Sequence, residues 1–174
     1  MISTVIVAFS MFSAIPMPQT EWTNKSMRYA LCAFPLIGAV IGGICWGVWS
    51  LCGLLGLPNL LRGAILTLIP VLVTGGIHLD GYSDTCDALA SHTSQEKKLE
   101  ILKDPHVGSF AVIRICSYFV ITLALWSALK SFPWVAVLLG FCMSRTLSGL
   151  AVASFPLAKN TGLAHTFAQA ADQQ

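Results

Sequence analysis

Three aspartates in the middle of the chain form the pattern with the clearest chemical meaning. Asp80, Asp84 and Asp87 are spaced i, i+4 and i+7, so on a helix their carboxylates project from one face. Such close carboxylates repel one another, and a cation would compensate the repulsion. Carboxylate oxygens with room for water suit Mg²⁺ or Mn²⁺. The pattern therefore predicts a divalent-metal site for phosphoryl chemistry; the alternative is a set of solvated loop acids or helix caps.

Two residues beside these aspartates are further candidates for the site. His78 could orient a carboxylate, accept a proton or meet a phosphate, although a single histidine is more often structural. Gly81 directly follows Asp80 and would let the backbone or a substrate approach closely, or it could instead mark a helix end.

A second acidic block lies about 15 residues further along the chain. Glu100 and Asp104 are again spaced i, i+4, and Lys103 and His106 beside them are candidate phosphate contacts. The alternative is a charged helix end fixed by a turn at Pro105. Both blocks belong to a segment, residues 80–106, that holds six of the eight acidic residues of the chain: Asp80, Asp84, Asp87, Glu96, Glu100 and Asp104.

Two arginines lie inside apolar stretches and need a partner there. Arg114 is the nearer to the acidic segment in the expected topology, and it is predicted to contact substrate; its planar guanidinium could grip a pyrophosphate. For Arg145 a structural ion pair is the preferred interpretation.

The composition places these residues in a membrane protein. Hydrophobic residues make up 55% and charged residues only 10% of the 174 residues, and the mean hydropathy is +0.73. Soluble domains carry about 25% charged residues. A net charge of +2 and the lack of a basic tract argue against a nucleic-acid partner. The lipid bilayer is the expected surroundings.

The apolar runs predict an all-α fold, a polytopic bundle of transmembrane helices in a single domain, 1–174. A short apolar helix over 1–15 is too short to span a bilayer. Pro70 and the pair Gly75–Gly76 predict a kink or unwinding within the second span. The four expected spans are 29–57, 60–79, 107–129 and 133–155, and a weakly amphipathic segment follows at 157–171.

The distribution of basic residues predicts the orientation. One side of the membrane receives six cations and the other receives Arg62 and Lys130, and the more basic side is expected to be cytoplasmic. The acidic segment then faces the cytoplasm from the cell (inner) membrane. The six cations are Lys25, Arg28, Lys97, Lys98, Lys103 and Lys159.

The two acidic blocks closely resemble the cobalamin synthase family, adenosylcobinamide-GDP ribazoletransferase. The resemblance lies in residues 75–87 (GGIHLDGYSDTCD), 99–104 (LEILKD) and 107–110 (VGSF). Supporting similarity extends along the chain, at residues 15–18, 34–38 and 162–164 and at Arg145.

The resemblance implies an integral membrane enzyme that depends on Mg²⁺. It would join adenosylcobinamide-GDP to α-ribazole or its 5′-phosphate, giving adenosylcobalamin or its phosphate and GMP. By position, the implied metal ligands are Asp80, Asp84, Asp87 and Glu100. The candidate bases are His78, Asp104 and His106, and the candidate substrate contacts are Lys103, Arg114 and Gly81.

Some positions depart from the family pattern. Ala88 and Ser83 stand where glycine and alanine are frequent, and both are small changes. Family members usually continue with a further Gly-Asp-containing segment and more helices, so this chain is expected to be a C-terminally truncated member.

Two other functions fit parts of the pattern. A CDP-alcohol phosphotransferase also places an Asp-Gly-rich array on membrane helices, but Thr85 stands where its motif requires arginine. A divalent-cation transporter would need acids from several helices near the middle of the bilayer, and here they cluster in one segment.

Overall fold

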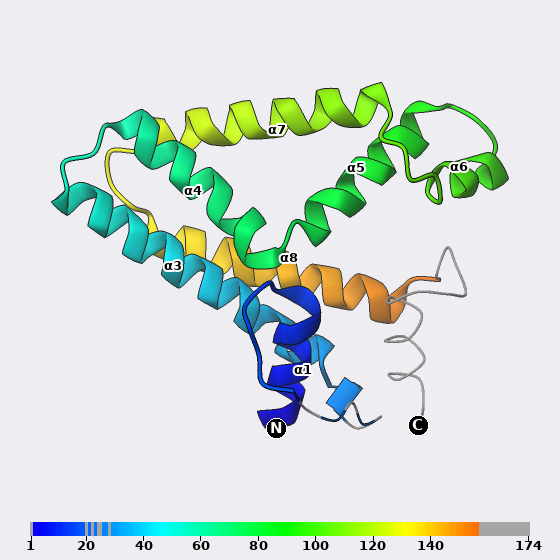
Figure 1. The fold of residues 1–174 in the computed structure, drawn as a ribbon, viewed down its shortest axis with the longest axis horizontal. Helices are drawn as coiled ribbons and strands as arrows, with labels where there is room; N and C mark the ends of the chain where they lie inside the picture. Colours follow the sequence, from blue (N-terminus) through cyan, green and yellow to red (C-terminus); the bar gives the residue numbers. More distant parts are fainter. Residues whose placement is uncertain (1, 20, 22, 24–25, 28, 157–174) are drawn as a thin grey trace. The chain divides into compact units, whose positions relative to one another are not determined.

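The computed structural model describes residues 2–19, 21, 23, 26–27 and 29–156, and all regular structure in them is helical (Figure 1). The predicted all-α fold is confirmed. The predicted helix over 157–171 lies outside the described residues. The elements are α1 (Ile2–Phe12), η1 (Leu31–Ala33), α3 (Phe34–Leu54), α4 (Asn59–Thr74), α5 (Ile77–Ala90), α6 (Gln95–Ile101), α7 (Ser109–Ala128) and α8 (Trp134–Ser154).

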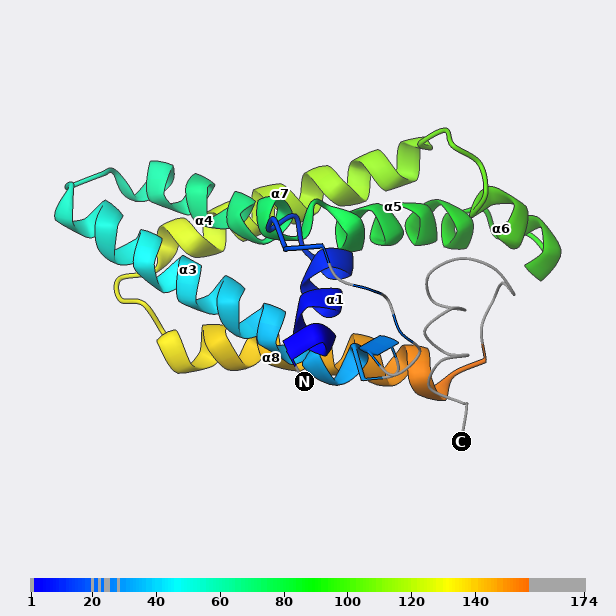
Figure 2. The same cartoon turned by 60° about the horizontal axis from the view of Figure 1, so that its bottom comes forward.

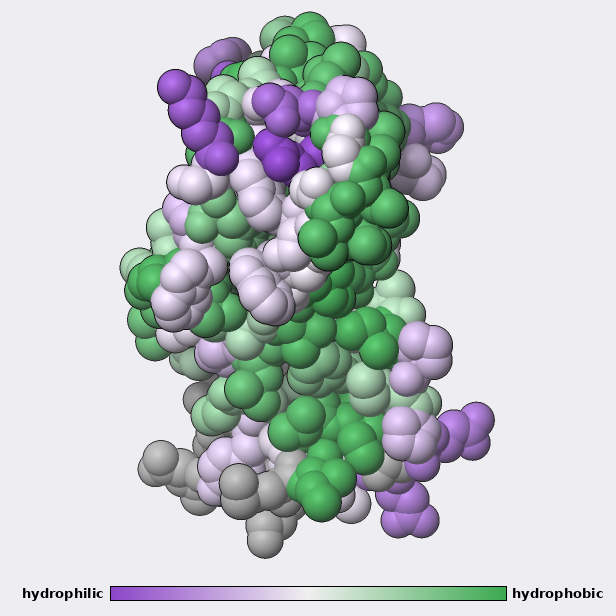
Figure 3. All heavy atoms as spheres, turned by 90° about the vertical axis from the view of Figure 1, so that its left-hand side faces the viewer, coloured by the Kyte–Doolittle hydropathy of each residue, from purple (hydrophilic) through white to green (hydrophobic). Residues whose placement is uncertain are grey.

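Three of the described helices are long and apolar enough to cross a membrane. They are Leu31–Leu54 (η1 with α3), Ser109–Ala128 and Trp134–Ser154, and α4 with α5 passes the same test only as a bent pair. These elements match the four predicted spans, and α1 matches the short N-terminal helix. Hydrophobic residues cover much of the surface in Figure 3, as contact with lipid requires.

The chain divides into two compact units, 1–48 with 131–174, and 49–130. In the first unit, α3 packs closely against α8. A Cβ added at Gly38 would lie 2.6 Å from the carbonyl carbon of Phe141, and one added at Gly42 would lie 3.1 Å from Cα of Leu138. The lack of side chains at Gly38 and Gly42 therefore permits the close helix contact. Gly43 and Gly47, further along the same helix, have open space at the position of a Cβ among the described residues.

In the second unit, two glycines break the second predicted span. Gly75 and Gly76 have φ of +64° and +79°, a left-handed conformation that is strained for other residues. The Gly76 N–H donates to the Val71 carbonyl at 2.9 Å and the Gly75 N–H to the Leu72 carbonyl at 3.4 Å, as in a Schellman motif that ends a helix. The chain then turns by 94° into α5. Pro70 lies inside α4, which continues past it.

Helix α7 closes the open side of this bent pair, running from the end of α5 to the start of α4, and it contacts both arms (Figures 1 and 2). Arms of 16 and 14 residues are about 24 and 21 Å long, and at a right angle they span about 30 Å, the length of the 20 residues of α7. Near the C-terminal end of α7, Ser127 fills the space beside Gly63 of α4, where a Cβ would lie 3.0 Å from the Ser127 backbone nitrogen. The bent pair therefore covers the same length as α7, which supports one interrupted span rather than a re-entrant loop.

Candidate functional site

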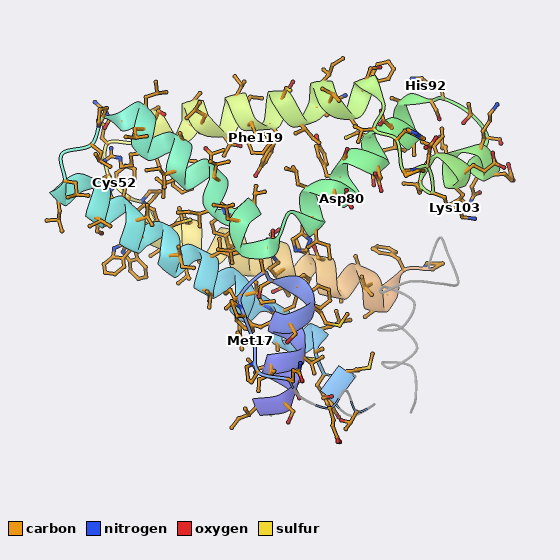
Figure 4. The ribbon with its side chains drawn as sticks, viewed as in Figure 1. Met17, Cys52, Asp80, His92, Lys103 and Phe119 are labelled. Atoms are coloured by element: carbon orange, nitrogen blue, oxygen red, sulfur yellow. The ribbon has the colours of Figure 1, made fainter. Side chains whose placement is uncertain are left out.

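Helix α5 carries the three aspartates on one face, as their spacing predicts. The left-handed Gly76 starts this helix, and the N–H groups of Leu79 and Asp80 both donate to the Gly76 carbonyl at 2.9 Å. Asp80 therefore lies in the first turn, where the positive end of the helix dipole stabilises a carboxylate. Figure 4 shows Asp80 on α5, the second arm of the bent pair.

Asp80 lines a cavity of about 440 Å³ between α5 and α7. The cavity extends from the glycine break to Val107 and Ile115, and Ser83 lies on the same wall as Asp80. Ile115 belongs to the membrane-spanning helix α7, so the cavity brings the Asp80 carboxylate beside an apolar residue of a span. Ionisable groups beside membrane spans are typical of functional residues in a membrane protein.

Asp87, two turns further along, accepts two hydrogen bonds from the start of α7. Its Oδ2 accepts from the Gly108 N–H at 2.6 Å and its Oδ1 from the Ala111 N–H at 2.9 Å. A Cβ at position 108 would lie 2.6 to 2.7 Å from the carboxylate atoms, so only glycine leaves room for the first contact. The helix-cap alternative for the aspartates is thus realised at Asp87, although the helix that it caps is α7.

The second acidic block forms a turn before α7. The Oδ1 of Asp104 accepts hydrogen bonds from the backbone N–H of His106 at 2.9 Å and from its Nδ1 at 2.7 Å. These bonds, the backbone one first, hold the pKa of Asp104 below its ordinary value. Because an ionised carboxylate only accepts, Nδ1 must be the donor, and Nε2 of His106 is then the basic nitrogen.

The tertiary structure brings this turn close to the first block. Asp87, Asp104 and His106 line one cavity of about 310 Å³, together with Gly108 and with Ser91 at the end of α5. Glu100 and Lys103 are exposed at the end of α6 and directly after it, and neither lines the two cavities. No three His, Cys, Asp or Glu side chains converge on a metal-binding point within the part of the chain that the structure describes.

The other predicted site residues lie on α5 and α7. His78 is in the first turn of α5 with Nε2 shielded from solvent, and Gly81 is exposed with open space at the position of a Cβ. Arg114 is exposed on α7, and its guanidinium has a Coulombic interaction with the side chain of Tyr82 on α5. The predicted roles of these three residues stay predictions.

Arg145 belongs to the other unit, where it is 7% exposed. Its Nη1 donates to Oγ of Ser144 at 3.3 Å, and the guanidinium lies 6.0 Å from the centre of the Phe34 ring. Neither of these contacts is an ion pair, so the structural ion pair expected from the sequence for Arg145 stays a prediction.

The sequence did not predict the hydrogen-bond donors to Asp87, which are the backbone N–H groups of Gly108 and Ala111. A glycine directly before α7, a helix without a local capping side chain, indicates that a distant group caps the helix. It does not indicate which carboxylate does so, because that depends on which two helix ends meet.

The chain is similar over nearly its whole length to proteins of a known family. Residues 4–174 match the family described as cobalamin-5-phosphate synthase. A protein of Lachnoclostridium phytofermentans named adenosylcobinamide-GDP ribazoletransferase is 49% identical over 173 residues, 99% of this chain and 66% of the relative. Relatives with the same name from Desulfitobacterium hafniense and Clostridium perfringens strain SM101 are 34% and 32% identical, over 96% and 92% of this chain and 67% and 65% of their own lengths. The chain thus spans about two thirds of these relatives. No solved structure matches it.

Proposed function

Because this chain belongs to the cobalamin-5-phosphate synthase family, we propose that it transfers the cobinamide-phosphate group of adenosylcobinamide-GDP to α-ribazole or its 5′-phosphate. The products are adenosylcobalamin, or its phosphate, and GMP. The name of the relatives supplies the donor and the ribazole acceptor. The observation in the structure that carries the proposal is that Asp87, from the first acidic block, and the turn of Asp104 and His106, from the second, line one cavity beside the start of α7.

The donor set on α5 suits Mg²⁺. Carboxylates are the hard oxygen ligands that Mg²⁺ prefers, and this ion is usually bound by one or two of them, with water and substrate phosphates completing its shell. Asp80 and Asp84 are neighbours at i, i+4 on α5 and would hold the ion. Asp87 and Glu100 are the further ligands predicted from the sequence, but both carboxylate oxygens of Asp87 already accept hydrogen bonds from the start of α7. The bound ion would neutralise charge on the pyrophosphate.

The turn before α7 would supply the base. A ribazole hydroxyl oxygen forms a bond to the phosphorus attached to cobinamide, the bond from that phosphorus to the bridging oxygen breaks, and GMP leaves with the electron pair. His106 Nε2 accepts the hydroxyl proton, while Asp104 holds the ring through Nδ1. His106 is 88% exposed in the side chain, so a substrate can reach it. His78 and Asp104 are the other candidates for the base.

The remaining candidates would bind the substrate. Lys103 and Arg114 would contact phosphates as cations, and Gly81 leaves space for a substrate beside Asp80. By the positive-inside rule, we place the acidic segment at the cytoplasmic face of the cell membrane, where nucleotides are available.

The decisive test is product formation by the chain in membranes. Membranes that contain it are incubated with adenosylcobinamide-GDP, α-ribazole and Mg²⁺, and GMP and the cobamide are measured. We expect both products in equal amounts, and neither without α-ribazole. Metal-dependent cation uptake into proteoliposomes without GMP release would instead support a transporter and refute the transferase. A longer version that includes the remaining third of the relatives' length, assayed in parallel, shows how much of the activity resides in this chain.

A further inference from the structure

The N-terminus of α7 lacks a capping group of its own. The first N–H groups of a helix have no partner within the helix, and a side chain at the N-cap position usually accepts from them. Here that position is Gly108, which has no side chain and makes no such bond. The carboxylate of Asp87 accepts from the Gly108 and Ala111 N–H groups instead, 21 and 24 residues away in sequence.

This contact connects the two halves of the candidate site. Asp87 is fixed on the helix that carries Asp80 and Asp84, while Gly108 is two residues after His106. The hydrogen bonds therefore hold the turn of Asp104 and His106 at a set distance from the aspartate face. Charge-assisted bonds of this kind are short and directional, so they suit such positioning.

We propose that Asp87 is a positioning residue, which ties the Asp104–His106 turn to the Asp80 and Asp84 face of α5 through the N-terminus of α7. The proposal rests on the proposed transferase function for its effect on rate. The sequence pattern predicts a metal ligand at the same position, so the experiment must separate the two roles.

The contact can be broken from either side. Asp87→Asn keeps the size of the side chain but offers one acceptor oxygen and places an amide against the other N–H. Gly108→Ala keeps the carboxylate but puts a methyl group within its space. Gly53→Ala is the matched control, because Gly53 lies in a helix with open space around it.

The variants of this chain, including the Asp87→Asn/Gly108→Ala double variant, are compared with the unsubstituted chain in lipid nanodiscs. If Asp87 is a positioning residue, kcat should fall about 10- to 100-fold in each single variant. The double variant should be no less active than the more impaired single variant, and the half-saturating Mg²⁺ concentration should stay within about twofold of the unsubstituted value. Hydrogen–deuterium exchange of residues 107–113 should rise in both single variants and stay unchanged in Gly53→Ala.

Three results would overturn the proposal. In the first, Asp87→Asn loses activity and its half-saturating Mg²⁺ concentration rises tenfold or more, while Gly108→Ala behaves like the unsubstituted chain. That result would identify Asp87 as a metal ligand. The second is full activity in either single variant. The third is unchanged exchange at the start of α7 in both. A chain without substitutions that releases no GMP refutes the transferase instead, and the exchange comparison then still decides whether Asp87 caps α7.

Discussion

At the scale of single residues, the three aspartates of α5 have different surroundings. Asp80 lines the cavity that also contains Ile115, and Asp87 caps α7. Asp84 lies between these two on the same face of the helix. Since Mg²⁺ is bound through one or two carboxylates in many enzymes, the pair of Asp80 and Asp84 is sufficient for the proposed ion.

Asp84→Asn should therefore reduce GMP release by about 100-fold or more, because the variant loses a charged ligand at the point where phosphate charge must be neutralised. Glu96→Gln, which changes an exposed acid of α6, should retain the activity. GMP release by membranes with equal amounts of inserted protein checks this. Full activity in Asp84→Asn would refute its metal role.

The Asp104 and His106 pair has a predictable pH dependence. The hydrogen bonds from His106 lower the pKa of Asp104 below its ordinary value of about 4. A depressed pKa means that ionised Asp104 stabilises the turn at every pH above that ordinary value, and that the stabilisation is lost only as the pH falls through the lower folded value.

Asp104→Ala removes the acceptor for Nδ1, so His106 loses its orientation, and we expect activity to fall about tenfold or more. Because Asp104 is ionised throughout roughly pH 5 to 8, its carboxylate accepts the hydrogen bond from His106 over that whole range, and the loss of activity is expected at every pH within it. Rate measurements at several pH values check it. Activity equal to that of the unsubstituted chain at any pH in this range would contradict the orientation of His106 by Asp104.

At the scale of elements, the break between α4 and α5 decides where the aspartates are placed. Two consecutive left-handed glycines end one helix and begin the next, so α5 starts within the span and directs Asp80 toward α7. A straight helix through residues 59–90 would instead have a length of about 48 Å, more than the hydrocarbon thickness of about 30 Å.

Gly76→Ala should therefore destabilise the protein by about 1–2 kcal/mol, because a Cβ at φ +79° is strained. The nearest atom to that Cβ, Cγ1 of Val71, is 4.0 Å away, so the strain arises in the backbone and not from a clash. Thermal unfolding in detergent measures the loss. Gly53→Ala serves as the helical control, and equal stability of the two variants would contradict the left-handed conformation.

At the scale of the whole molecule, the number of spans predicts which side of the membrane holds each connection. Counted as one interrupted span, α4 and α5 predict that the α5–α6 connection lies on the side where α3 begins and that the α7–α8 connection lies on the opposite side. The distribution of Lys and Arg then predicts a cytoplasmic acidic segment.

Labelling of single cysteines tests this topology. In a variant whose six native cysteines are replaced, Ser131→Cys should react with an impermeant thiol reagent in right-side-out vesicles. Gln95→Cys should react only after the vesicles are permeabilised. Labelling of both positions from outside would show that α7 does not cross the membrane. The reverse pattern would show that α4 and α5 form a re-entrant loop or that the orientation is inverted.

The sequence by itself determined the membrane class, three of the four spans within a few residues of their ends, the break at Gly75–Gly76 in the remaining span and the shared face of three aspartates. It did so because apolar runs and the helical period are local properties of the chain. Only the tertiary structure decided the 94° turn, the cavity at Asp80 and the bonds from Asp87 to Gly108 and Ala111. These features depend on which helix ends meet in space, and spacing along the sequence does not encode that.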